Sequence, residues 1–195
     1  MANEDKHAFL LAGFHEKINN PGYRHIGKQL RKLGFKVHFL NIHWNHKTMS
    51  DYIAQFDAAY IKHQARVNLV LGFSFGAMIA YLSATKLQPN YLFLCSLSPY
   101  FREDLSGLTK ADRLAIGRKR YVDFHKYSFN SVNRIDSRCI LFLGEKEIPE
   151  VKLRVNAAHA ALPGSELVII EKGKHSINQQ EYFNTINNKL AKLLL

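Results

Sequence analysis

Residues 68–81 read Asn-Leu-Val-Leu-Gly-Phe-Ser-Phe-Gly-Ala-Met-Ile-Ala-Tyr, and this stretch decides the fold. The apolar run before Ser74 predicts a buried strand, and the run after it predicts a helix. Between them lies a G-x-S-x-G pattern, with Gly72 and Gly76 on either side of the serine. A sharp strand-to-helix turn of this kind strains the backbone of its serine and exposes the hydroxyl. Ser74 is therefore a candidate nucleophile, and the N–H group of Phe75 would point at an oxyanion.

The rest of the chain alternates strand and helix patterns in the same way. Short apolar runs bounded by turn residues predict six strands, at Ala8–Gly13, Lys36–Ile42, Asn68–Phe73, Tyr91–Leu97, Arg138–Gly144 and Leu167–Glu171. Helices are predicted at Pro21–Leu33, Met49–Lys62, Gly76–Leu87, Pro149–Ala161 and Ser176–Leu194. This alternation indicates an α/β fold with a doubly wound, mainly parallel six-stranded sheet flanked by helices. A length of 195 residues suits one domain, spanning 1–195.

One long connection, Pro99 to Asp136, interrupts the alternation. Its middle, Thr109 to Tyr121, has a helical pattern that Thr109 and Asp112 could cap. Connections of this length in a compact domain are often lids or binding loops. We therefore expect residues 100–136 to form a small helical lid insertion that overhangs the carboxyl edge of the sheet.

A serine nucleophile needs a base and an orienting acid. Among ten histidines, His175 is favoured because it follows the last predicted strand and so shares a sheet edge with Ser74. The acid should follow the fifth strand, where Glu147 is the first choice, Glu145 the reserve and Glu150 a third candidate. These glutamates could equally be solvated residues near a helix N-terminus. The chain order of serine, acid and histidine favours a catalytic role.

These motifs give the sequence a resemblance to the α/β-hydrolase superfamily, specifically to its small serine esterases and thioesterases. The resemblance covers nearly the whole chain and rests on GFSFG at 72–76, GEKEIP at 144–149 and GKHS at 173–176. It implies a minimal α/β-hydrolase fold in which Ser74 is the nucleophile, His175 the general base and acid, and Glu147 the orienting acid. It also implies an oxyanion hole formed by the N–H groups of Phe75 and Phe14.

Candidate substrate-binding residues lie around this serine: His15, Phe73, Tyr100 and Phe101. Together with Phe14 and Phe75 they suggest an apolar acyl pocket. Phe73 and Phe101 have an alternative interpretation, as ordinary core residues. His38, His43 and His46 are close in sequence, but their spacing matches no metal-ligand signature, so neither a metal nor a cofactor is expected.

The chain carries 27 Lys and Arg against 16 Asp and Glu, a net charge of +11. This balance favours anionic partners, namely nucleic acid, anionic lipid, or a phosphorylated or carboxylated small-molecule substrate, but a solvated basic surface is the simpler explanation. No nucleic-acid-binding signature accompanies the charge. No apolar run is long enough for a membrane span, and the two cysteines lie in apolar runs as expected of buried, reduced thiols in a cytoplasmic protein.

The expected reaction is hydrolysis of a carboxylic ester or thioester through a Ser-His-Glu triad and an acyl-enzyme. Two alternatives stay open. One is a non-enzymatic binding protein on a hydrolase scaffold that recognises an anionic partner. The other is a different chemistry on the same triad, such as peptidase or acyltransferase activity.

Overall fold

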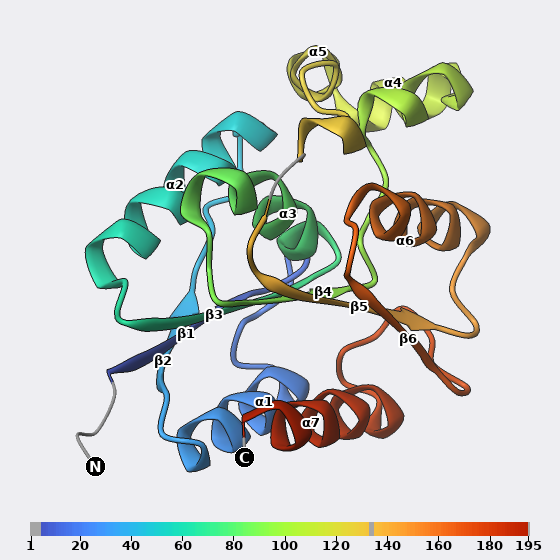
Figure 1. Ribbon diagram of the computed structural model, residues 1–195. Coiled ribbons are helices and arrows are strands. Elements are labelled where there is room, and N and C mark those ends of the chain that lie inside the picture. The colour runs from blue at the N-terminus through green and yellow to red at the C-terminus, as the bar shows by residue number, and fades with distance from the viewer. Residues whose placement is uncertain (1–4, 133–134, 195) are drawn as a thin grey trace.

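A single six-stranded sheet forms the centre of the computed structural model, which describes residues 5–132 and 135–194 (Figure 1). Its strands follow the order β2-β1-β3-β4-β5-β6, and every neighbouring pair is parallel. The strands are β1 (Lys6–Leu11), β2 (Lys36–Leu40), β3 (Val67–Phe73), β4 (Tyr91–Cys95), β5 (Arg138–Gly144) and β6 (Glu166–Ile170). All six predicted strands are confirmed, with boundaries that shift by one or two residues.

Helices cover both faces of the sheet, as a doubly wound architecture requires. In Figure 1, α1 and α7 lie below the sheet, and α2, α3 and α6 lie above it. These helices are α1 (Pro21–Lys32), α2 (Met49–His63), α3 (Phe75–Leu87), α6 (Pro149–Ala161) and α7 (Gln180–Leu194). The last helix begins at Gln180 rather than at Ser176, because Gln179 instead accepts the backbone N–H of Lys174.

The long connection after β4 folds into short helices rather than one. Its elements are two 3-10 helices (Arg102–Gly107 and Phe129–Ser131), α4 (Lys110–Ile116) and α5 (Arg118–Phe124). The helical pattern predicted over 109–121 is confirmed, but Gly117, with a φ of 82°, divides it into two helices in a left-handed conformation that glycine adopts without steric cost. The predicted cap is confirmed, because Thr109 and Asp112 form a capping box at the start of α4.

The core divides into one cluster on each face of the sheet. Cys95 and Cys139 are free and buried within it, as predicted. Burial raises the pKa of the Cys139 thiol to about 12 and that of Cys95 well above its ordinary value. No helix within the described residues is long and apolar enough to cross a membrane.

The strand order reverses between β1 and β3, because β2 lies on one side of β1 and the remaining strands lie on the other. In open α/β sheets such a switch point leaves a crevice outside the carboxyl ends of the strands. At this crevice the start of α3 lies directly against the end of β1. A Cβ atom added to Gly76 would lie 2.4 Å from the carbonyl oxygen of Leu11, and one added to Gly72 would lie 2.3 Å from that of Gly76.

We predict that Gly76→Ala lowers the free energy of unfolding by about 3 kcal/mol, because the added methyl would overlap backbone atoms that cannot move aside. The matched control is Gly107→Ala, whose Cβ would meet nothing within 4 Å. It should change stability by less than about 0.5 kcal/mol. Urea denaturation of the three proteins measures both values, and equal stability of the two variants would contradict the crowding argument.

Three histidines lie together at the sheet edge formed by β2. The His38 ring stacks on Phe9 and on His63, and its Nε2 lies 3.2 Å from His7 Nδ1. His7 Nδ1 also donates to the His63 carbonyl, so His38 Nε2 must accept the His7 proton as a neutral ring. Burial, followed by the charges of His7, His63 and Lys36, lowers the pKa of His38 to about 4.

This lowered pKa predicts a loss of stability in acid. The unfolded chain, with an ordinary histidine pKa of about 6.5, binds the proton more readily than the folded one, so His38 destabilises the fold as pH falls from about 6.5 towards 4. His38→Phe keeps an aromatic ring without the titration. Relative to the original protein it should gain about 1 kcal/mol between pH 7.5 and pH 5, after allowance for solvent screening. Denaturation curves at both pH values test this, and a pH-independent difference would refute it.

Candidate active site

Ser74 occupies the turn between β3 and α3 in a strained conformation. Its φ and ψ are 55° and −120°, which a non-glycine residue seldom adopts. The turn is held in place because the Ser74 N–H donates to the Cys95 carbonyl at 2.9 Å and the Ser74 carbonyl accepts from Ala77 and Met78. The side chain therefore projects from the carboxyl edge of the sheet, as the sequence motif predicts.

His175 bridges Ser74 and Glu147. Its Nε2 lies 3.0 Å from Ser74 Oγ, and its Nδ1 lies 2.8 Å from Glu147 Oε2. A carboxylate can only accept, so it fixes the proton on Nδ1 and leaves the Nε2 lone pair directed at the serine hydroxyl. The glutamate side chain is fully buried, whereas the histidine side chain is 37% exposed. The three sequence candidates thus form one connected line.

Glu147, rather than the other two glutamates, lies beside the histidine. Glu145 is exposed and accepts the backbone N–H of Lys172 at 2.8 Å, which ties together the loops after β5 and β6. Glu150 is exposed in the first turn of α6. The chain reverses direction after Gly144, and Glu147 is the carboxylate that this turn directs into the protein.

Two residues that sequence reasoning missed support this carboxylate. Ser96 donates from its hydroxyl to Glu147 Oε1, and Tyr182 on α7 bonds to the same hydroxyl at 2.5 Å. Ser96 has a φ of 46°, so the first residue after β4 turns its side chain towards the neighbouring strand end. Its position directly after a strand was the available signal. Tyr182 gave none, because its role depends on how α7 packs across the sheet.

The loop after β1 supplies a second backbone donor beside Ser74. The N–H groups of Phe14 and Phe75 donate no hydrogen bond within the described part of the chain. The neighbouring N–H of Gly13 is occupied, because it donates to Tyr23 at 3.1 Å and more weakly to Glu16. A Cβ atom on Gly13 would lie 3.3 Å from Ser74 Cβ, which shows how closely the two loops approach.

An apolar cavity of about 250 Å³ adjoins these two N–H groups. It is lined by Phe14, Phe75, Tyr100, Asp112, Ala115, Ile116, Arg120 and Phe124. The Phe14 and Phe75 rings meet with centroids 5.2 Å apart. Tyr100 lines this cavity, and residues of the connection between β4 and β5 contribute most of the remaining lining.

Phe73 and Phe101 do not line this cavity. Both are fully buried in the core, the alternative that the sequence had left open. Phe73 nonetheless contacts the site, because its ring centroid lies 5.0 Å from that of His175 and 5.6 Å from that of Tyr182. Phe101 packs on Tyr81 and Phe129 instead.

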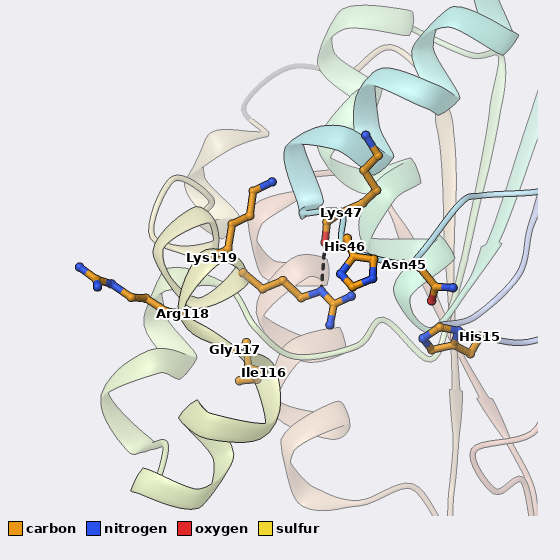
Figure 2. A pocket seen from close by; sticks show the side chains of 9 residues that line it. His15, Asn45, His46, Lys47, Ile116, Gly117, Arg118 and Lys119 are labelled. Carbon is orange, nitrogen blue, oxygen red and sulfur yellow. Dashed lines mark hydrogen bonds between the residues drawn. The ribbon is translucent and has the colours of Figure 1, made fainter.

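A second, larger cavity of about 590 Å³ shares Ile116 and Arg120 with the apolar one and is bordered by His15 (Figure 2). It is lined by His15, Asn45, His46, Lys47, Ile116, Gly117, Arg118, Lys119 and Arg120. His38, His43 and His46 do not gather in the structure: His38 belongs to the histidine cluster on β2, and the other two are exposed in the β2–α2 loop. Within residues 5–132 and 135–194, no three His, Cys, Asp or Glu side chains form a group that could hold a metal ion.

The insertion over 100–136 is fastened to the domain at several points, among them Ser50 of α2 and Arg154 of α6. Asp123 on α5 accepts from the backbone N–H and the hydroxyl of Ser50, at the start of α2. Burial alone would raise the pKa of Asp123, but hydrogen bonds from Lys126 and Ser50 bring it below its ordinary value. At the base of the insertion, Asp104 forms an ion pair with Arg154 of α6 at 2.8 Å.

Comparison with known proteins gives structural relatives but no sequence relatives. No family model and no curated protein matches the sequence. Est1E from Butyrivibrio proteoclasticus, solved with ferulic acid bound, has a TM-score of 0.83 at 12% identity and covers 98% of this chain and 89% of its own. Mouse alpha/beta hydrolase domain-containing protein 10 also reaches 0.83, at 10% identity, over 96% and 89% of the two chains.

The esterase Pf2001 of Pyrococcus furiosus is similar too, with a TM-score of 0.69 at 18% identity over 98% of this chain and 84% of its own. These identities are low, so the likeness concerns the fold. The sheet order, the serine turn between β3 and α3 and the structural neighbours agree with one another. The chain therefore has the fold of the α/β-hydrolase superfamily.

Proposed function

We propose that this protein is a serine hydrolase that cleaves carboxylic esters or thioesters through an acyl-enzyme. The observation that carries the proposal is the single line of hydrogen bonds from Ser74 Oγ through the His175 ring to Glu147. A nucleophile, a base and a group that orients the base stand within hydrogen-bond distance of one another, which is the arrangement that nucleophilic catalysis by serine requires.

In the first half of the reaction, Ser74 Oγ attacks the substrate carbonyl while His175 Nε2 takes the hydroxyl proton. Glu147 stabilises the imidazolium that forms. The carbonyl oxygen becomes an oxyanion, which the N–H groups of Phe14 and Phe75 would stabilise; losing one such donor typically costs about 10²–10³ in rate. The imidazolium then protonates the departing alcohol or thiol, and the acyl group stays on Ser74.

In the second half, His175 removes a proton from water, and the resulting hydroxide attacks the acyl-enzyme. The second oxyanion collapses, Ser74 leaves with the proton held by His175, and a carboxylic acid is released. The half-exposed histidine can exchange protons with solvent, whereas the buried glutamate cannot. His175 is therefore suited to carry the proton that moves during the reaction, and Glu147 is suited to keep a constant negative charge.

The apolar cavity beside Phe14 and Phe75 would hold the acyl chain. It opens next to both oxyanion donors, and its far wall is formed by the lid residues Ile116 and Phe124. The insertion at 100–136 would then act as a lid that shields the reaction from water and limits the size of the acyl group. An esterase among the structural neighbours is consistent with this reaction.

Replacing the nucleophile tests the proposal directly. Ser74→Ala should lower kcat/KM for 4-nitrophenyl butyrate by at least about 10⁴-fold and abolish covalent labelling by a fluorophosphonate probe. Intact-mass spectrometry measures the label, and circular dichroism verifies that the variant is folded. Labelling that persists in the variant would assign the nucleophile elsewhere, and a folded original protein that neither labels nor turns over substrate would contradict the proposal.

The two neighbouring glutamates provide a matched pair. Glu147→Gln presents an amide to His175 and disturbs its tautomer, so kcat should fall by about 10³–10⁴. Glu145→Gln alters an exposed side chain of the same size that does not contact His175, and should change kcat by less than about threefold. Steady-state kinetics on both variants decides the matter. Equal losses would show that the acid acts through the loop rather than through the histidine.

A further inference from the structure

We infer that the basic cavity beside the catalytic residues binds a phosphate-bearing leaving group, so that the substrate is an acyl ester or thioester of a phosphorylated alcohol or thiol. This inference rests on the proposed hydrolase function and specifies its substrate class. The apolar cavity would take the acyl chain, and the basic cavity would take the phosphorylated part.

The first observation is uncompensated positive charge. The residues that line the basic cavity include Lys47, Lys119 and Arg120, and no Asp or Glu is among them. No carboxylate in the described part of the chain forms an ion pair with any of these three cations. Clustered cations around a concavity focus a positive potential, which attracts multiply charged anions such as phosphate.

Asp51 interacts electrostatically with Lys47 and Lys119, but its carboxylate already accepts hydrogen bonds from Thr48. The Thr48 N–H lowers the pKa of Asp51 first, and Lys47 and Lys119 add a weaker effect through their charge. Its carboxylate caps α2 by accepting from Thr48 at 2.8 Å and 3.0 Å. Asp51 does not line the basic cavity, although it shares a neighbouring surface depression with Lys119, which lines both.

The second observation is a guanidinium that is fixed in place with donors to spare. Arg120 donates through Nε to the Lys47 carbonyl at 3.0 Å and through a terminal nitrogen to the Trp44 carbonyl at 3.1 Å. The former bond is the dashed line in Figure 2. The Tyr52 hydroxyl also hydrogen-bonds to this guanidinium, so two of its five N–H donors remain for a ligand. Because the side chain is already ordered, binding an anion costs little further entropy.

The third observation is the position of Arg120 between the two cavities. Arg120 and Ile116 line both of them. The guanidinium also lies over the Phe14 ring, 5.2 Å from its centroid. Phe14 carries one of the two proposed oxyanion donors, so the basic cavity begins next to the reacting carbonyl. A substrate with an acyl group in one cavity and a phosphorylated group in the other would span Arg120.

The volumes and the number of cations favour phosphate over a single carboxylate. The basic cavity, at about 590 Å³, is more than twice the size of the apolar one, at about 250 Å³. A dianionic phosphate can accept hydrogen bonds from several cations at once, and such charge-assisted bonds are the stronger ones. Figure 2 shows Arg118 extending away from His46 and Asn45, so the inference does not depend on Arg118.

The test uses two thioesters that differ only in the phosphate, S-butyryl-4′-phosphopantetheine and S-butyrylpantetheine. We expect kcat/KM to be at least about tenfold higher for the phosphorylated substrate, a difference of about 1.4 kcal/mol. In the double variant Lys47→Gln, Lys119→Gln the ratio should fall below about threefold. The ratio cancels any general effect of the substitutions on catalysis.

The matched control is Lys28→Gln, Lys62→Gln, which removes the same charge from exposed positions on α1 and at the end of α2 where the chain enters β3. Its substrate ratio should equal that of the original protein. Equal kcat/KM for the two thioesters in the original protein, or an equal loss of preference in both double variants, would overturn the inference while leaving the hydrolase function standing.

A separate measurement covers failure of the hydrolase proposal itself. If neither thioester is cleaved and Ser74 does not label, the anion site is judged by calorimetric titration of inorganic pyrophosphate. Binding that weakens at least about fivefold in Lys47→Gln, Lys119→Gln, but not in the control, would support the site. Absent binding, or binding that is equal in all three proteins, would overturn it.

Discussion

The N-terminus of α3 lies against the carbonyl oxygens of Leu11 and Ala12, with no room for a Cβ atom at Gly76. This backbone contact is possible only because glycine stands there, and it has two effects. It bends the chain sharply enough to hold Ser74 at positive φ, and it brings the loop after β1 beside the serine. Phe14 and Phe75, which follow different strand ends, therefore lie side by side with their ring centroids 5.2 Å apart. The arrangement of the site follows from that contact.

A second constraint is the buried carboxylate of Glu147, which has lost all contact with water. Such a group stays charged only where hydrogen-bond donors replace the solvent. Here the replacements are the His175 Nδ1–H and the Ser96 hydroxyl, and the latter bonds in turn to Tyr182. Because each oxygen of the carboxylate has its own donor, the side chain is held in one orientation. The histidine tautomer depends on that orientation. The hydrogen bonds of Tyr182 and Ser96 therefore affect Ser74 indirectly, through Glu147 and His175.

The sequence was sufficient to place Ser74, Glu147 and His175 together because each directly follows a strand, and parallel strands bring their carboxyl ends to one edge. Local sequence position is then equivalent to spatial position. Ser96 also directly follows a strand, but the predicted strand 91–97 included it, so the sequence did not indicate that the chain turns at this residue. Tyr182 and Arg120 could not be found this way. Their roles depend on how a helix and an insertion dock onto the sheet, which no local pattern specifies. For the same reason the sequence did not show which aromatic residues line the cavity and which lie in the core, because phenylalanine is equally suited to both environments.

The long connection between β4 and β5 contributes lining residues to both cavities. Its two halves differ in packing: α5 buries Asp123 and Phe124, whereas α4 buries no residue at all. The segment that carries Arg120 is thus fixed to the start of α2 through Ser50, whereas α4, which precedes Gly117, rests on the surface. Few contacts would be lost if α4 alone were displaced, so its local stability is low compared with that of α5. Arg120, one of the two residues that line both cavities, therefore belongs to the rigid part of the insertion, whereas Ile116 and the other α4 residues that border the apolar cavity belong to the adaptable part. This arrangement holds the Arg120 charge in a constant position while the boundary of the apolar cavity can adapt.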